Sequence, residues 1–253
     1  MSLDAALIAT SDDALMGGRV TLRQPLDGYR VAIDPVILAA AVPAGAQDRV
    51  IDIGSGTGAA SLCLAARVPG CSVVGLERDR GLAALGRGNI AANGLEARLS
   101  VIAGDLLHRP AALAPGSFTQ AMANPPYLEA ARASASPIAA RASAAVEGEA
   151  SLSDWIDFAL TMLRDKGMLT FIHRADRLGD LLAALAGRAG GIVVFPLWPG
   201  EGNPAKRILL QAKKGSAAPL TLAAGLILHR ADGRNSDVAE VILRHGAALP
   251  LVP

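Results

Sequence analysis

Aromatic residues and cysteines are scarce in this chain of 253 residues, and neither sign of charge dominates. Only 3% of the residues are aromatic, so a core must be built from aliphatic side chains. The two cysteines, Cys63 and Cys71, lie in apolar segments away from any clustered histidine, which argues against a disulfide framework or a zinc site. The formal net charge of +1 does not by itself indicate a nucleic-acid-binding protein.

The sequence also lacks segments that direct a protein to or through a membrane. No uncharged apolar run reaches about 18 residues, the length that a membrane-spanning helix needs. The start carries Asp4, Asp12 and Asp13 and no basic region, so we expect no signal peptide. We therefore expect a cytoplasmic monomer or homodimer with no membrane partner and no metal.

What the chain does contain is a regular alternation of strand-like and helix-like segments. Apolar strand-like runs cover 49–53, 72–76, 99–103, 118–123, 168–173, 192–195 and 206–212. Helix-like segments cover 35–42, 59–67, 79–93, 151–164, 176–189 and 236–245, and an extended stretch covers 220–228. Buried strands alternating with helices indicate an α/β fold with a mostly parallel sheet covered on both faces.

The first of these core strands runs into a glycine loop, Asp52-Ile53-Gly54-Ser55-Gly56-Thr57-Gly58. Glycines let the backbone approach a ligand closely, and a strand–loop–helix setting is typical of nucleotide-like cofactors. The dinucleotide fingerprint is also met, by Gly54, Gly56 and Ala59, so the loop alone leaves a nicotinamide cofactor open.

Three carboxylates around this loop favour S-adenosylmethionine over a dinucleotide. Asp52 precedes the first glycine, Glu77 ends the second strand at a distance that suits a ribose-binding acid, and Asp105 follows the third strand. Carboxylates attract the ammonium and sulfonium groups of S-adenosylmethionine, and a diphosphate gains nothing from them.

The tetrapeptide Asn124-Pro125-Pro126-Tyr127 follows the fourth strand. The Asn124 side chain and the Pro125 carbonyl offer two hydrogen-bond acceptors, and Tyr127 offers a flat stacking surface. Together they suit a planar substrate with an NH2 group, such as an adenine flipped out of its stack.

In order and spacing, the glycine loop, Glu77, Asp105 and the tetrapeptide resemble the class I S-adenosylmethionine methyltransferases of the amino-methylating branch. Residues 28–39, 206–210 and 226–233 are similar to the bacterial tRNA-valine adenine-N6 methyltransferase family. The resemblance implies a Rossmann-like, seven-stranded, mostly parallel sheet with an antiparallel last strand. It also implies a single domain with an N-terminal extension (1–47), a catalytic core (48–213) and a C-terminal tail (214–253).

The resemblance assigns roles to individual residues. Catalytic roles fall to Asn124, Pro125 and Tyr127. Contacts with S-adenosylmethionine are expected from Asp52, Gly54, Ser55, Gly56, Gly58, Glu77, Arg78, Asp105, Leu106 and Asn124. Contacts with the target are expected from Pro126 and from Asp34, although an Asp34-Pro35 pair also suits the start of a helix with Asp34 as N-cap.

A local basic excess points to a polyanionic partner. Segment 164–214 carries nine basic residues against four acidic ones, and residues 128–150 read as an arginine-bearing loop that could close over a substrate. Phosphate contacts are therefore expected from Arg132, Arg141, Lys206 and Arg207, although a solvated basic face would give the same pattern.

The sequence predicts methylation of an exocyclic amino group, with adenine in tRNA as the preferred target. Methylation of a protein glutamine amide stays open, because an amide is also planar with an NH2 group. A nicotinamide-dependent oxidoreductase is disfavoured by Asp52 and Asp105. A binding module without catalysis is disfavoured by the intact Asn124 and Tyr127.

Overall fold

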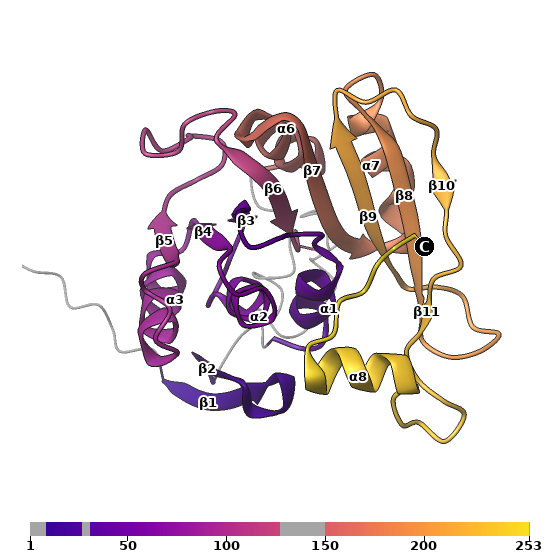
Figure 1. The fold of residues 1–253 in the computed structure, drawn as a ribbon, viewed down its shortest axis with the longest axis horizontal. Helices are drawn as coiled ribbons and strands as arrows, with labels where there is room; N and C mark the ends of the chain where they lie inside the picture. Colours follow the sequence, from indigo (N-terminus) through magenta and orange to yellow (C-terminus); the bar gives the residue numbers. More distant parts are fainter. Residues whose placement is uncertain (1–8, 27–30, 127–149, 253) are drawn as a thin grey trace, which may run out of the picture.

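The computed structural model describes residues 9–26, 31–126 and 150–252 of the chain. Within these residues a nine-stranded sheet lies between two layers of helices (Figure 1). The strands follow the order β10-β8-β9-β7-β6-β3-β4-β5, and β11 pairs with β8 beside this path. A separate two-stranded hairpin, β1 and β2, precedes the sheet in the chain.

The bounds of the elements follow the apolar segments of the sequence. The strands are β1 (Thr10–Leu15), β2 (Val20–Pro25), β3 (Arg49–Ile53), β4 (Ser72–Glu77), β5 (Leu99–Ala103), β6 (Phe118–Ala123), β7 (Leu163–Arg174), β8 (Ala189–Trp198), β9 (Arg207–Lys214), β10 (Thr221–Leu222) and β11 (Leu226–Ile227). The helices are α1 (Asp34–Ala41), α2 (Ala59–Arg67), α3 (Arg80–Ala92), α6 (Leu152–Met162), α7 (Leu178–Leu185) and α8 (Asp237–His245), with short 3-10 turns η1 (Met16–Gly18) and η2 (Ala175–Arg177).

The direction of the strands confirms the predicted sheet. Strands β5, β4, β3, β6 and β7 pair in parallel, whereas β9 runs antiparallel to both β7 and β8. The carboxyl ends of the parallel strands therefore meet at one edge, where open α/β sheets hold their ligands.

The sheet has two strands more than the seven predicted. The extended stretch near 220–228 adds β10 and β11, which pair in parallel with β8 at the edge of the sheet. Each has only two residues, which is too short for the alternation of apolar and polar residues that marks a strand in a sequence. Its pairing depends on the neighbouring strand.

Alternate residues of the central strands fill two separate hydrophobic cores. Val50 of β3 and Ile172 of β7 belong to the core beneath α1, α2, α3 and α8. Ile51 of β3 and Phe171 of β7 belong to the core beneath α6 and α7. Both faces of the sheet are therefore buried, which explains why its strands read as continuous apolar runs.

The predicted bounds of α1, α6, α7, β7 and β8 were wrong, and strand β1 was missed. Helix α1 begins at Asp34 but has Ile33 as its N-cap, so Asp34 is not the cap. Helices α6 and α7 are shorter than expected, since the chain enters β7 at Leu163 and ends α7 at Leu185, before Gly187 with its positive φ of 71°. Strand β1 carries adjacent acidic residues, which weaken the alternating pattern that marks a strand.

Candidate functional site

The residues singled out in the sequence gather at the carboxyl edge of the sheet. Central strand β3 runs into the glycine loop, and β4 and β6 pair with β3 on either side. Glu77 ends β4, and Asn124 follows β6 directly. The candidate cofactor residues and the candidate target residues therefore flank one loop.

Gly54 and Gly56 differ in what lies beside them in the loop. A Cβ on Gly54 would lie 2.5 Å from the Trp155 ring of α6, so this glycine allows the helix to pack against the loop. Gly56 has a φ of 55°, and a Cβ there would meet nothing within 4 Å. The backbone of Gly56 therefore borders open space that a ligand could fill.

The carboxylate of Glu77 lies across the loop. Its Oε2 accepts a hydrogen bond from the Gly56 N–H at 2.8 Å, and its Oε1 accepts from the Asp79 N–H at 2.8 Å. Burial raises the pKa of Glu77, whereas these backbone donors lower it. Burial is the larger effect, so the pKa of Glu77 lies above its ordinary value, and the carboxylate sits next to the open side of Gly56.

Asp52 is buried and points toward helix α2. Its Oδ2 accepts a hydrogen bond from the Ser61 hydroxyl at 2.6 Å. Burial raises the pKa of Asp52 to about 6, the Ser61 hydroxyl opposes this rise, and the negative charge of Glu77 adds to it. The sequence interpretation missed Ser61, because a serine in an apolar helix gives no signal of its partner.

Two small hydroxyls of the loop lack partners among the described residues. The Ser55 Oγ and the Thr57 Oγ1 are both buried without a hydrogen bond from that part of the chain. Buried polar atoms of native proteins nearly always have a partner, so these two hydroxyls are exceptions within the described residues. The Ser55 hydroxyl lies against β4, since a Cβ on Gly75 would be 2.6 Å from its Oγ.

The remaining cofactor candidates lie near the ends of β4 and β5. Asp105 accepts a hydrogen bond from the Leu107 N–H through Oδ1 at 3.0 Å, so it shapes its own turn. Leu106 packs partly buried against the core beneath α6 and α7, and Arg78 is exposed. Their contacts with a cofactor stay predictions.

Only part of the Asn-Pro-Pro-Tyr motif lies within the described residues. Asn124 and Pro126 are half-buried and Pro125 is buried, whereas Tyr127, Arg132 and Arg141 lie outside the described residues. Asn124 takes part in polar interactions at its site. The motif therefore leaves β6 with its acceptor groups at the edge of the sheet.

His173, near the end of β7, contacts this motif, and the sequence interpretation assigned it no role. It is fully buried, and its Nδ1 accepts from the Arg174 N–H at 2.9 Å. Burial, with the charge of Arg177 as a smaller cause, lowers its pKa to about 4, and a hydrogen bond with the Pro126 carbonyl works in the opposite direction. A neutral imidazole therefore packs against Pro126 at neutral pH.

The predicted target residue Asp34 has a different partner from the one expected. Its Oδ2 lies 2.7 Å from the Nε of Arg207, and the Asp34 side chain is 2% exposed. Arg207 was predicted to contact phosphate, but its guanidinium forms an ion pair with this buried carboxylate. Lys206, next to it, is exposed and stays a candidate for a phosphate contact.

Other arginines of the basic segment also lie beside acids. Arg174 pairs with Asp176, and Arg177 pairs with Asp180. Arg188 pairs with Asp157 of α6, which lies outside the segment that was counted. The local excess of positive charge is therefore smaller than the sequence count indicates.

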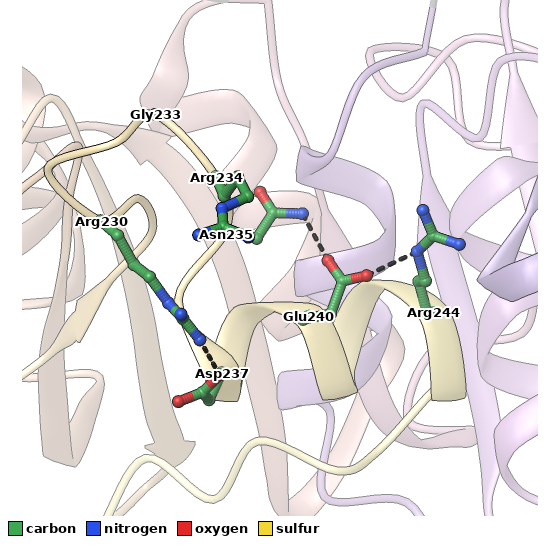
Figure 2. Close-up of a pocket in the computed structure, with 7 residues that line it drawn as sticks. All are labelled: Arg230, Gly233, Arg234, Asn235, Asp237, Glu240 and Arg244. Carbon is green, nitrogen blue, oxygen red and sulfur yellow. Dashed lines mark hydrogen bonds and ion pairs between the residues drawn. The ribbon is translucent and has the colours of Figure 1, made fainter.

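Two pockets on the described residues do not coincide with this site. One, of about 460 Å³, lies beside α8, where Arg230 pairs with Asp237 and Arg244 pairs with Glu240 (Figure 2). Its third arginine, Arg234, pairs with Asp232. The other, of about 670 Å³, lies beside Trp198 and the loop that follows it. Neither pocket includes a residue of the glycine loop. The candidate site is therefore defined by the contacts of its residues and not by a pocket.

Two features are absent from the described residues. Within 9–26, 31–126 and 150–252, no group of three or more His, Cys, Asp or Glu side chains could hold a metal ion. No helix within these same ranges combines the length and apolarity that crossing a membrane requires.

Comparison with known families finds similarity to methyltransferases. A family model of the methyltransferase small domain matches residues 32–153. A tRNA1(Val) (adenine(37)-N6)-methyltransferase of Porphyromonas gingivalis is 34% identical over 158 residues. That alignment covers 60% of this chain and 61% of the relative, so it spans less than two thirds of the relative's length. A protein of the same name from Aeromonas hydrophila is 28% identical and aligns over 82% of this chain and 86% of its own length.

Solved structures share the fold. A predicted O-methyltransferase from Agrobacterium tumefaciens superposes with a TM-score of 0.72 at 28% identity, covering 85% of this chain and 98% of that one. A tRNA (m1A58) methyltransferase from Aquifex aeolicus gives a TM-score of 0.55 at 14% identity and covers 77% of this chain and 73% of its own; this likeness shows the fold alone. The names of these relatives agree on methyl transfer and differ in the acceptor atom.

Proposed function

We propose, from the premise that this chain is a class I S-adenosylmethionine-dependent methyltransferase, that it methylates the exocyclic N6 amino group of adenine in tRNA. The family match at residues 32–153 and the sheet order support the class. The similarity to adenine-N6 methyltransferases of tRNA supports the target. A cytoplasmic location belongs to the same proposal.

The loop fits S-adenosylmethionine. Gly56 borders open space, Glu77 ends the neighbouring strand beside it, and the buried hydroxyls of Ser55 and Thr57 have no partner among the described residues. We assign Glu77 to the ribose hydroxyls and Asp105 to the adenine amino group. When bound, S-adenosylmethionine supplies an electrophilic methyl group. The acidic surroundings suit its positive charge and disfavour a diphosphate.

The acceptors after β6 suit an amino group of low nucleophilicity. The lone pair of an adenine amino nitrogen is delocalised into the ring, so the nitrogen must become pyramidal before it reacts. The Asn124 side-chain oxygen and the Pro125 carbonyl can each accept a hydrogen bond from one of its two N–H groups, which favours that geometry. The same dipoles stabilise positive charge that develops on nitrogen. No strong base is needed beforehand, because the proton becomes acidic after transfer.

One observation carries the proposal: Glu77 and Asn124 follow the two strands that pair with β3, with the glycine loop between them. Binding of the cofactor on one side of the loop thereby brings its reactive end toward the acceptors on the other. Catalysis then consists largely of in-line positioning.

A protein glutamine amide is the second candidate acceptor. It offers the same planar NH2 group to Asn124 and Pro125, so the described geometry fits it equally. The similarity to tRNA methyltransferases favours the nucleic acid. Single-stranded tRNA loops expose bases for such recognition.

We expect S-adenosylhomocysteine to bind the protein and raise its melting temperature, and NAD⁺ to do neither. Ligand binding to the folded state stabilises it by an amount that grows with occupancy. Isothermal titration calorimetry with each ligand makes the comparison. Binding of NAD⁺ without binding of S-adenosylhomocysteine would overturn the assignment.

A further inference from the structure

We propose that Asn89 of α3 is a positioning residue for the cofactor, and that through it the N-terminal hairpin β1–β2 sets the affinity for S-adenosylmethionine. The inference rests on the proposed function, because it concerns the same glycine loop. It adds a residue and an element that lie outside the motifs of the sequence.

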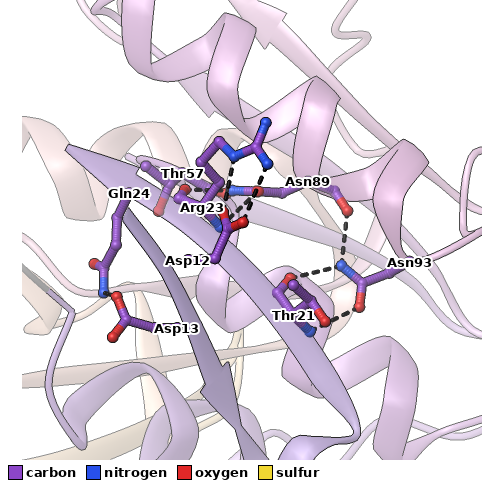
Figure 3. A network of polar contacts seen from close by, with 8 residues as sticks. All are labelled: Asp12, Asp13, Thr21, Arg23, Gln24, Thr57, Asn89 and Asn93. Carbon is purple, nitrogen blue, oxygen red and sulfur yellow. Dashed lines mark hydrogen bonds and ion pairs between the residues drawn. The ribbon is translucent and has the colours of Figure 1, made fainter. Parts of the chain in front are cut away.

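Asn89 is 2% exposed and makes three hydrogen bonds to main-chain atoms. Its Oδ1 accepts from the Arg23 N–H at 2.8 Å, and its Nδ2 donates to the Arg23 carbonyl at 2.8 Å. The same Nδ2 donates to the carbonyl of Thr57 in the glycine loop at 2.9 Å (Figure 3). One side chain therefore joins strand β2 to the cofactor loop.

Asn93, the C-cap of α3 four residues after Asn89, repeats the contact with β2 without reaching the loop. Its Oδ1 accepts from the Thr21 N–H at 3.0 Å, and its Nδ2 donates to the Thr21 carbonyl at 2.7 Å (Figure 3). Its third bond goes to the Asn89 carbonyl of its own helix at 2.8 Å. The two asparagines differ in their third partner, and only that of Asn89 lies in the glycine loop.

The Asn89 side chain holds one carbonyl of the loop, and other groups hold the neighbouring backbone. The Gly58 N–H donates to the Ser55 carbonyl at 2.8 Å, so the peptide between Thr57 and Gly58 is held at both of its polar ends. Helix α3 also packs on the loop, since a Cβ on Gly86 would lie 3.3 Å from the Gly56 carbonyl oxygen. Loss of the Asn89 donor leaves the Thr57 carbonyl buried without a partner and favours a rearranged loop next to Gly56.

Further side-chain contacts beside Arg23 hold the hairpin. The buried Gln24 donates from Nε2 to Asp13 at 2.7 Å and accepts from the Val31 N–H through Oε1 at 2.9 Å. Across the same strands, Arg23 pairs with Asp12 at 2.8 Å. Side-chain contacts thus hold the hairpin in place, and Asn89 connects it to the glycine loop.

The test compares Asn89→Asp with Asn93→Asp in the full chain. Each replacement keeps one acceptor oxygen and removes the NH2 donor, so both weaken the contact with β2. We expect Asn89→Asp to weaken S-adenosylhomocysteine binding about tenfold and to raise the KM for S-adenosylmethionine with kcat little changed. Asn93→Asp is expected to keep the Kd within about twofold of the wild type.

The outcomes separate failure of this inference from failure of the proposed function. Equal Kd values for the two variants, at whatever melting temperature, would show that Asn89 is only structural and overturn the inference. Failure of the wild-type protein to bind S-adenosylhomocysteine would instead overturn the proposed function. If Asn89→Asp does not fold, Asn89→Ala and Asn93→Ala take the place of the pair, since each removes the whole amide without adding a buried charge.

A measurement on the wild type needs no variant. Coupling between two sites is reciprocal, so a hairpin that strengthens ligand binding must itself be stabilised by the ligand. We expect saturating S-adenosylhomocysteine to slow hydrogen exchange of the Arg23 amide, which donates to Asn89. Unchanged exchange of this amide on ligand binding would contradict the coupling.

Discussion

Asn124→Ala is expected to lower kcat by about a hundredfold or more while leaving the Kd for S-adenosylhomocysteine nearly unchanged. The side chain lies directly after β6, and the proposal gives its oxygen to the reacting amino group. Removing one such preorganised dipole from a transition state costs about 2.7–4 kcal/mol in comparable sites. Single-turnover kinetics with saturating tRNA, together with calorimetry, separate the two effects.

Asn124→Asp is the matched control for this prediction. It keeps an acceptor oxygen at the same position and is expected to retain more activity than the alanine variant. Turnover close to that of the wild type in Asn124→Ala would remove this residue from the mechanism. A parallel loss of cofactor binding would show that Asn124 acts on the cofactor instead.

Glu77→Ala is expected to weaken S-adenosylhomocysteine binding by about 1.5–3 kcal/mol, which is about 10-fold to 150-fold in Kd. The variant removes a charged acceptor for the ribose hydroxyls and the partner of the Gly56 N–H. Calorimetry at neutral pH measures the change directly.

Glu77→Gln separates these two roles. It keeps an oxygen for the Gly56 N–H but loses the negative charge, so its affinity is expected to lie between those of the wild type and Glu77→Ala. An unchanged Kd in Glu77→Ala would show that the ligand does not reach the end of β4. The assignment of the loop as the cofactor site would then fail.

The positions of the central strands could be predicted from sequence because each is a continuous apolar run bounded by turn residues. Strands β3, β5 and β6 begin and end at the predicted residues. Such runs arise because both faces of the sheet are buried, and burial is a strong local signal. The edge strands β10 and β11 have no such signal, since their pairing is set by the neighbouring strand β8.

The motifs of the site were visible in the sequence, but the partners of its side chains were not. Asp34 was interpreted as a helix cap because Asp-Pro is common at that position. Its actual partner is Arg207, 173 positions later in the chain (207 − 34). Contacts over such separations depend on the fold and leave no local pattern.

Side chains that act on the backbone were equally hidden. Asn89 and Asn93 sit at the i, i+4 spacing of one helix face, which indicates that they share a surface but not what that surface meets. His173 reads as the end of a strand, and its contact with Pro126 follows from the pairing of β6 and β7. The sequence therefore predicts the chemistry of the motif better than the residues that hold it in place.

The acceptor atom is the central claim, and mass spectrometry of nucleosides tests it most directly. The purified protein is incubated with isotope-labelled S-adenosylmethionine and, in parallel, with total tRNA and total cell protein. We predict label in tRNA, recovered after digestion as N6-methyladenosine. Label confined to glutamine of a protein, or found in tRNA as a methylated guanine, would contradict the account.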